Sequence, residues 1–441
     1  MKKIDFYATS YEQYFWCGTK SSLGRCQEYL KGLFHECKSN IERMQERIPD
    51  SIYQNIQHFI SHSPWDWRGV MGEVSRRMAF SFAFLTEPCG LIIDESGWEK
   101  SGKKSVGVAR QYIGNVGKVS NGQVGVFGAL CRGDKVGLVG SRLYLPKEWT
   151  SGPARCNEAG IPKNEQHYRT KPELAIEIIK DLTGNVAYDW IGGDAQYGNS
   201  PTLRHFLQLE DKVFVLDVGE SLGVYLSNPE PYLPAKEEGR GRTPIRYKSE
   251  QNPIVLKNLI LNLPDEQWHT LTHRRGTKGP LKRQAVLLDI WVWGTEDGDK
   301  VEAAQLLISR ELDGSEVKFS LCHQPHEPMT LQDALYRQMQ RYWVERAFQD
   351  VKEQLGLHQY QVRSWIAWYH HVALTMMALH FILQTRIEEK EDLPLLSCPD
   401  VKIMLAKTLS NKLNTQNGIS SAIQKRHEQR QADIDRYKNY S

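Results

Sequence analysis

The sequence lacks the cysteine and histidine patterns that bind zinc and the long apolar runs that cross membranes. Its eight cysteines are scattered, with no C-x-x-C pair and no paired histidine cluster at zinc spacing, so we expect reduced thiols in a cytosolic protein. No stretch approaches 18 consecutive apolar residues, and residues 1–5 are not followed by the apolar segment of a signal peptide. We therefore expect an intracellular protein that does not span a membrane.

The sequence also has little net charge. Lys and Arg number 56 against 53 Asp and Glu, a balance of +3, so the whole chain is not a strongly basic nucleic-acid binder. Residues 100–170 differ, because they hold twelve basic and four acidic residues, a local excess of +8 that could neutralise several DNA phosphates. The alternative is a solvated sheet edge protected by lysines.

A chain of 441 residues is long enough for two or three domains. Apolar residues at helical spacing predict a helical N-terminal domain, which could bind DNA through a helix-turn-helix or be plain helical packing. The predicted layout is that helical domain at 1–85, the first part of a catalytic core at 86–220, a mostly β insertion at 221–328, core helices at 329–387 and a polar tail at 388–441.

Two predicted strands end in aspartate. The run LIID ends in Asp94, and VAYDWIGGD ends in Asp194. The order is strand, two antiparallel strands, helix, strand, helix, strand, which is the order of a ribonuclease H-like fold. We therefore expect an α/β protein with a mixed sheet, whose further elements are strands near 105–114, 122–130, 136–146 and 213–219 and helices at 171–182 and from 199–201.

The predicted insertion begins with a polar, basic stretch at 236–248. Three apparent strands follow it, at 285–293, 303–309 and 317–322. The insertion is therefore expected to be mostly β.

A helix predicted from Thr330 to Gly356 carries an unusual polar stripe. Gln338, Arg341, Glu345 and Lys352 share one face, because seven residues return to within roughly 20° of the starting direction. This face has one carboxylate flanked by cations where a core face would be apolar. The combination suits a metal ion held beside a nucleic-acid phosphate.

Asp94, Asp194 and Glu345 can converge at one edge of such a sheet. Carboxylate oxygens suit Mg²⁺ or Mn²⁺, and two ions roughly 3.5 to 4 Å apart can promote in-line phosphoryl transfer. The sequence therefore predicts a two-metal site with these three residues as catalytic metal ligands.

Three other carboxylates compete for a place in this site. Asp189 is predicted inside its strand, Asp217 follows a different strand, and Glu353 lies about 80° around the helix from Glu345. On this reasoning we expect none of them to be a ligand.

The motif resembles that of the DDE transposases of bacterial insertion sequences, in the branch with the signature Y-x2-R-x3-E-x6-K. Arg341-x3-Glu345-x6-Lys352 fits every interval, whereas Gln338 stands where the pattern has tyrosine. The downstream run LGLHQYQVRSW and the apolar helix after it are similar as well, and the resemblance covers about residues 89–384.

The resemblance implies a cut-and-paste transposase that hydrolyses DNA at transposon ends and joins the freed 3′-hydroxyl to target DNA. It implies metal binding by the three carboxylates and DNA contacts by Arg341, Lys352 and the residue at position 338. Expected partners are double-stranded DNA, as inverted-repeat ends and target, and a second copy of the chain in the DNA complex. The expected location is the bacterial cytoplasm, on the nucleoid when bound to DNA.

Relatives in this family place an aromatic residue of the β insertion against a flipped base. Trp268, Trp291 and Trp293 lie in the matching interval. Because Trp291 and Trp293 alternate within an apparent strand, core packing competes with this role.

Two other functions remain open. A ribonuclease H-like nuclease would cut DNA without strand transfer, and a captured transposase would only bind DNA.

The adjacent His370 and His371 do not suggest a metal site, because their side chains point about 100° apart. We expect one to pack and the other to face solvent.

Overall fold

The structure is a computed structural model of the chain. It describes residues 2–35, 38–235, 244–245, 247–276, 279–293, 301–412 and 416–438. Most of the basic stretch predicted at 236–248 lies outside the described residues.

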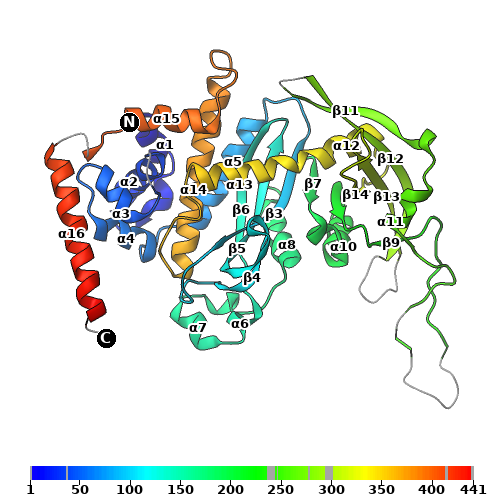
Figure 1. The fold of residues 1–441 in the computed structure, drawn as a ribbon, viewed down its shortest axis with the longest axis horizontal. Helices are drawn as coiled ribbons and strands as arrows, with labels where there is room; N and C mark the ends of the chain where they lie inside the picture. Colours follow the sequence, from blue (N-terminus) through cyan, green and yellow to red (C-terminus); the bar gives the residue numbers. More distant parts are fainter. Residues whose placement is uncertain are drawn as a thin grey trace.

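The first part of the chain is helical, as its periodicity predicts. Apolar side chains on one face of the second helix, among them Leu30, Leu33 and Phe34, are buried in a core shared with the later helix α14 (Trp365–Glu388). Figure 1 shows these N-terminal helices beside α14. A short hairpin, whose two strands have two residues each, precedes the second helix. The elements are α1 (Lys2–Thr9), β1 (Trp16–Cys17), β2 (Lys20–Ser21), α2 (Leu23–Phe34), α3 (Ile41–Arg47), α4 (Tyr53–Ser61) and α5 (Trp67–Phe82).

One large mixed sheet forms the centre of the molecule. In the described part of the chain its strands follow the order β11-β12-β13-β14-β8-β7-β3-β5-β4, with β6 also paired to β5. The first strands along the chain are β3 (Cys89–Glu99), β4 (Ala109–Ile113), β5 (Lys118–Arg132), β6 (Lys135–Leu143), β7 (Trp190–Gly193) and β8 (Phe214–Val218). The fold is therefore α/β with a mixed sheet, as predicted.

Several connecting helices start where the sequence indicates. Thr170 and Glu173 form a capping box at the start of α8 (Lys171–Leu182), and Ser200 caps α10 (Pro201–Leu209). The remaining short elements here are α6 (Lys147–Thr150), α7 (Pro153–Glu158) and α9 (Ala195–Gly198). Helix α9 was not predicted.

The predicted strand ending at Asp94 is wrong in its bounds. Strand β3 continues to Glu99, because its antiparallel pairing with β5 runs from Cys89 to Glu99. What stops near Asp94 is the parallel pairing with β7, whose last partners are Ile93 and Gly193. Asp94 thus lies inside one strand but at the end of one ladder.

Four strands of the predicted insertion, β11 to β14, extend this same sheet, whereas β9 and β10 pair with each other in a separate two-stranded sheet. Strand β14 pairs antiparallel with β8, so the sheet continues from the core into the insertion (Figure 1). The elements are β9 (Gly223–Val224), β10 (Ile254–Val255), α11 (Leu256–Leu259), β11 (His269–Gly276), β12 (Gly279–Trp293), β13 (Val301–Arg310) and β14 (Lys318–His323).

The helix predicted from Thr330 to Gly356 is divided at Arg341. Helix α12 (Leu331–Gln340) begins after the Thr330 cap, and α13 (Tyr342–Glu353) follows directly. Arg341 keeps helical dihedral angles, φ −56° and ψ −30°, so the two helices run on across the sheet (Figure 1).

Helix α14 (Trp365–Glu388) forms the core between the N-terminal helices and the sheet. It is long and apolar enough to cross a membrane by length and composition, but 94% of its most apolar window is buried inside the protein. The expectation that one of its two adjacent histidines faces solvent is wrong, because His370 and His371 are both fully buried. Helices α2, α4 and α5 and strand β6 of the sheet all pack against α14, and they leave both histidines buried.

The predicted polar tail is largely helical where it is described. It contains α15 (Cys398–Thr408) and α16 (Gln416–Lys438). Helix α15 begins with a capping box made by Ser397 and Asp400.

Candidate active site

Three aspartates form a row across three neighbouring strands. The parallel registers pair Ile93 with Gly193 and Gly193 with Leu216. The next residue of each strand segment is Asp94, Asp194 and Asp217 respectively. The row therefore lies at the carboxyl ends of the parallel ladders, the edge at which α/β sheets bind ligands.

Asp94 and Asp194 are part of a close carboxylate cluster. Oxygens of Asp94, Glu95 and Asp194 lie within 4.8 Å of one another. Burial, followed by repulsion from Asp194, raises the pKa of Asp94 to about 8, although Arg341 opposes the shift. Burial and then Glu95 also raise the pKa of Asp194. The protein thus holds carboxylates together at an electrostatic cost that a bound cation would relieve.

Glu95 was not predicted as part of the site. Its two oxygens already have partners, since Lys171 Nζ lies 2.7 Å from Oε1 and the Tyr197 hydroxyl donates to Oε2 at 3.0 Å. These contacts hold Glu95 beside the aspartates and neutralise its charge.

Arg341 lies among the carboxylates that surround this edge. Its Nε donates to Asp217 Oδ2 at 3.0 Å, and its terminal nitrogen lies 2.9 Å from Glu345 Oε1 and 3.8 Å from Asp94 Oδ2. Burial alone would lower the pKa of Arg341, but Asp217, Glu345, Asp94 and Asp194 together raise it. The guanidinium therefore stays charged and links the helix to the row of aspartates.

Its place on a different strand does not keep Asp217 away from the site. Asp217 does belong to a different strand, but β8 lies directly beside β7 and brings Asp217 level with Asp194. The available signal was a single acid near the end of the apolar run VFVLDV. Asp189 precedes β7, at the other end of that strand, where it accepts a hydrogen bond from the Cys89 amide at 2.6 Å.

Glu345 is connected to the carboxylate cluster only indirectly, by its ion pair with Arg341. Its side chain is 54% exposed, and it is not one of the three carboxylates that lie within 4.8 Å of one another. Lys352 lies about two turns after Glu345 on the same face of α13. Its ammonium donates to the Gly97 carbonyl at 3.1 Å. Burial lowers the pKa of Lys352 to about 8, with Asp94 opposing the shift.

The structure separates Gln338 from the other three members of the predicted stripe. It is 3% exposed and bonds to Ser309 and Ser320 beneath α12. The prediction of a single polar face accessible to DNA along 338–352 is therefore wrong, because the sheet covers Gln338, the first position of that face.

The three tryptophans considered for base stacking are partly or fully packed. Trp268 is 9% exposed, with the Arg310 guanidinium 3.8 Å from its ring centre. The backbone of Trp291 pairs with Tyr225, whose ring also lies 5.8 Å from that of Trp293.

A cavity of about 770 Å³ opens beside Asp194 and Arg341. Its wall carries Lys257 and Lys318 as well as the apolar Leu261, which is 81% exposed. Among the described residues that line it there is no tryptophan. The cavity joins the carboxylate row to the strands of the insertion.

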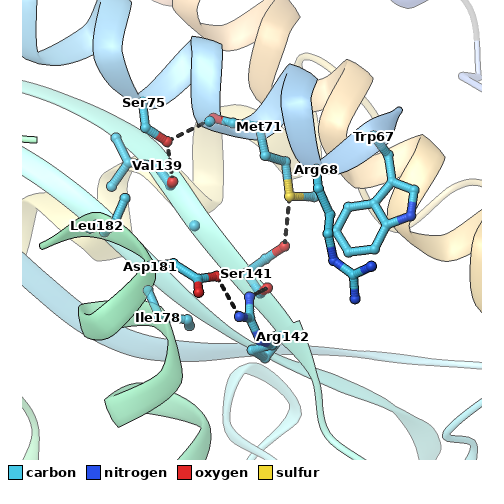
Figure 2. Close-up of a pocket in the computed structure, with 12 residues that line it drawn as sticks. Trp67, Arg68, Met71, Ser75, Val139, Ser141, Arg142, Ile178, Asp181 and Leu182 are labelled. Atoms are coloured by element: carbon cyan, nitrogen blue, oxygen red, sulfur yellow. Dashed lines mark hydrogen bonds and ion pairs between the residues drawn. The ribbon is translucent and has the colours of Figure 1, made fainter. Parts of the chain in front are cut away.

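A second cavity, of about 290 Å³, lies between α5, β6 and α8 (Figure 2). Arg142 on its wall is paired with Asp181, and Ser75 donates to the Met71 and Val139 carbonyls. None of the predicted catalytic residues lines it. The first cavity, in contrast, is lined by Asp194 and Arg341 and is the better candidate for the site of chemistry.

The basic segment at 100–170 is less free than its composition suggests. Five of its twelve cations are in ion pairs within the protein, namely Arg132, Lys135, Arg142, Arg155 and Arg169. Much of the local charge thus stabilises the fold.

Sequence comparison decides the family. The model of the family described as DDE superfamily endonuclease matches residues 15–280, more than half of the chain. The chain belongs to this family. The matched segment includes the aspartate row on β3, β7 and β8. The helix that carries Glu345 lies beyond it.

Two further proteins are similar to this DDE family member. "Probable transposase for insertion sequence element IS701" from Microchaete diplosiphon is 35% identical over 200 residues, and the match covers 43% of this chain and 47% of that protein. The chain thus matches about half the length of this relative. The solved structure titled "Cryo-EM structure of piggyBac transposase synaptic complex with hairpin DNA (SNHP)" aligns over 97% of this chain and 78% of its own, with 12% identity and a TM-score of 0.40.

Proposed function

We propose that this DDE family member is a cut-and-paste DNA transposase with a ribonuclease H-like catalytic core. The observation that carries the proposal is the row of aspartates on three neighbouring strands, where the parallel ladders end, together with the nearby Arg341 and Glu345 side chains. The 35% identity to a probable insertion-sequence transposase supports the same reaction class.

The donor set fits divalent cations. Asp94, Asp194 and Glu345 are the proposed ligands, and Mg²⁺ or Mn²⁺ prefers such oxygen donors. The raised pKa of Asp94, caused by burial and by repulsion from Asp194, supports a cation between the two aspartates. When bound, a pair of such ions lowers the pKa of water and stabilises the departing oxygen of a phosphodiester.

Arg341, at the junction of α12 and α13, and Lys352, in α13, are proposed to bind the DNA backbone. Arg341 keeps a charged guanidinium beside the carboxylates, and the Lys352 ammonium lies next to Gly97 on β3. Both groups would receive phosphate oxygens flanking the scissile bond and would hold that bond in line with the carboxylates. Because burial lowers the pKa of Lys352, contact with a phosphate would raise that pKa again and favour the charged ammonium.

The proposed reaction has two steps at one site. Water adds to phosphorus at the transposon end, and the 3′-oxygen leaves with a proton. The freed 3′-hydroxyl then attacks a target phosphodiester, so that a new ester forms and the target 3′-oxygen leaves.

The proposed domain layout follows the sequence. Residues 1–85 form the helical domain, 86–220 and 329–387 the catalytic core, 221–328 the insertion and 388–441 the tail. A homodimer on paired transposon ends is proposed as the working assembly. The cavity beside Asp194, with Lys257 and Lys318 on its wall, supports DNA binding by the insertion as well as by the core.

The test is a strand-joining assay with DNA that carries the inverted repeats of the element, a target plasmid and Mg²⁺ or Mn²⁺. Joined products are expected from the wild type. They should vanish in Asp94→Ala, Asp194→Ala and Glu345→Ala. Asp189→Ala is the matched control, since Asp189 lies at the other end of β7, and it should still join DNA.

Two other outcomes would replace the proposal. Cleavage without joining would identify a ribonuclease H-like nuclease. Salt-sensitive DNA binding with neither cleavage nor joining would identify a captured transposase that acts as a DNA-binding protein.

A further inference from the structure

A chain of buried polar groups leads from the insertion strands to Arg341. Ser309 on β13 donates to Gln338 Oε1 at 2.6 Å, and Gln338 Nε2 donates to Ser320 Oγ at 2.7 Å. Ser320 on β14 donates to Asp217 Oδ1 at 2.6 Å, and Arg341 Nε donates to Asp217 Oδ2 at 3.0 Å. Three elements of the sheet and the α12–α13 junction are thus joined by side chains.

The directions of these hydrogen bonds are consistent along the whole chain. Each hydroxyl donates once, the Gln338 amide uses its oxygen and its nitrogen, and both Asp217 oxygens accept. Ser309 and Ser320 are fully buried and Gln338 is 3% exposed, so water does not compete for these bonds. A fully satisfied buried network of this kind fixes the orientation of its members.

The orientation of Asp217 determines what Arg341 can do. With Nε bound to Asp217, the terminal nitrogen Nη1 lies 2.9 Å from Glu345 and 3.8 Å from Asp94. Arg341 lies at the junction of α12 and α13, where the backbone alone does not orient a long, flexible side chain. Without Asp217 the guanidinium would lose the contact that fixes its plane.

We propose that Asp217 is a positioning residue for Arg341 and that Ser320 and Gln338 hold Asp217 in the orientation this requires. The proposal rests on the proposed function, since Arg341 must act on DNA for its position to matter. It also gives a role to Gln338, which departs from the tyrosine of the helix signature and lies too deep to contact DNA.

The expected effect is on rate and not on DNA affinity. A displacement of about 1 Å at a reacting centre can cost about a hundredfold in rate. We expect Ser320→Ala and Gln338→Leu to lower the cleavage rate at saturating DNA by about 10- to 100-fold, with the Kd for DNA within about twofold of wild type. Ser320→Thr keeps the hydroxyl and should restore most of the rate.

Gln340 offers a matched control for Gln338. It lies on the same helix, is 4% exposed, and its Oε1 is 3.0 Å from Cys131 Sγ, away from the network. Gln340→Leu therefore makes the same buried substitution two residues away. If both leucine variants lower the rate equally and melt at the same temperature, general damage to α12 explains the loss and the proposal is overturned.

The decisive experiment is a double-mutant cycle on the DNA cleavage rate with Asp217→Asn and Arg341→Lys. Lysine has no Nε donor at the matching position, so the proposal predicts that Asp217→Asn lowers the rate by about 10- to 100-fold in the wild type and by less than about threefold in Arg341→Lys. Equal losses in both backgrounds would show that Asp217 acts independently of Arg341. An inactive wild type would instead refute the proposed function.

Discussion

Acid should destabilise the helical core through its buried histidines, and His370 provides the clearest case. It is fully buried, its ring lies 3.9 Å from that of Trp65, and its Nδ1 lies 2.8 Å from the Ile60 carbonyl oxygen. Nε2 is buried with no hydrogen-bond partner. Burial accordingly lowers the pKa of His370 to about 4.

The sign and size of the effect follow from this shift. The unfolded chain binds a proton near pH 6.5 and the folded chain only near pH 4, so the contribution of His370 is complete above pH 6.5 and is lost as pH falls toward 4. Between pH 8 and pH 5 the loss is about 2 kcal/mol for this one residue. Buried carboxylates such as Asp94 titrate in the opposite sense, so the useful quantity is a difference between variants.

The assay is urea unfolding at pH 8 and pH 5, followed by tryptophan fluorescence, which includes Trp65 beside the ring. His370→Gln keeps an N–H donor for Ile60 but does not titrate, and it should lose about 2 kcal/mol less than the wild type between the two pH values. His269→Gln, at an exposed position, should behave as the wild type does. Equal pH dependence in wild type and His370→Gln would refute the reasoning.

Three further predictions concern the site. Lys352→Ala should reduce the slope of log K against log salt for DNA binding by about one, as the loss of one phosphate contact requires, and an unchanged slope would remove Lys352 from the interface. Glu345→Gln should lower the rate of DNA cleavage more than about a hundredfold. Glu95→Gln should lower it about tenfold or less, because both carboxylate oxygens of Glu95 already have partners within the protein. The reverse order would make Glu95 the third ligand. Gly198→Ala should lower the free energy of unfolding in urea by about 3 kcal/mol and lower activity, because the new Cβ would lie 1.9 Å from a carbonyl oxygen of β8. Gly24→Ala should be nearly neutral, because a Cβ there meets nothing within 4 Å.

The sequence predicts best those features that local chemistry determines. The predicted helix at 171–182 has the bounds of α8, because Thr170, Pro172 and Glu173 mark its start in the sequence itself. The strands at 285–293, 303–309 and 317–322 overlap β12, β13 and β14, because their apolar runs are long and rich in β-forming residues. The aspartates at positions 94 and 194 fall side by side, as the predicted fold requires.

Features that depend on pairing between distant segments were not predictable in this way. Asp217 joins the site because β8 lies beside β7 in parallel register. The acid near the end of the run VFVLDV is a local signal, but it does not reveal which strand lies beside this one. The burial of Gln338 depends on β13 and β14 passing beneath α12. The burial of both His370 and His371 depends on the helices and the sheet that pack against α14. In each case the tertiary neighbours decide the role of the residue.

The most direct test of the account is metal rescue of DNA cleavage. Asp94→Cys and Asp194→Cys replace a hard oxygen ligand by a thiolate, which binds Mg²⁺ poorly and accepts softer ions such as Mn²⁺ more readily. The account predicts that both variants lose cleavage in Mg²⁺ and regain part of it in Mn²⁺, while Asp189→Cys cleaves as the wild type does in either ion. Cleavage in Mg²⁺ by Asp94→Cys and Asp194→Cys at the rate of Asp189→Cys would contradict it.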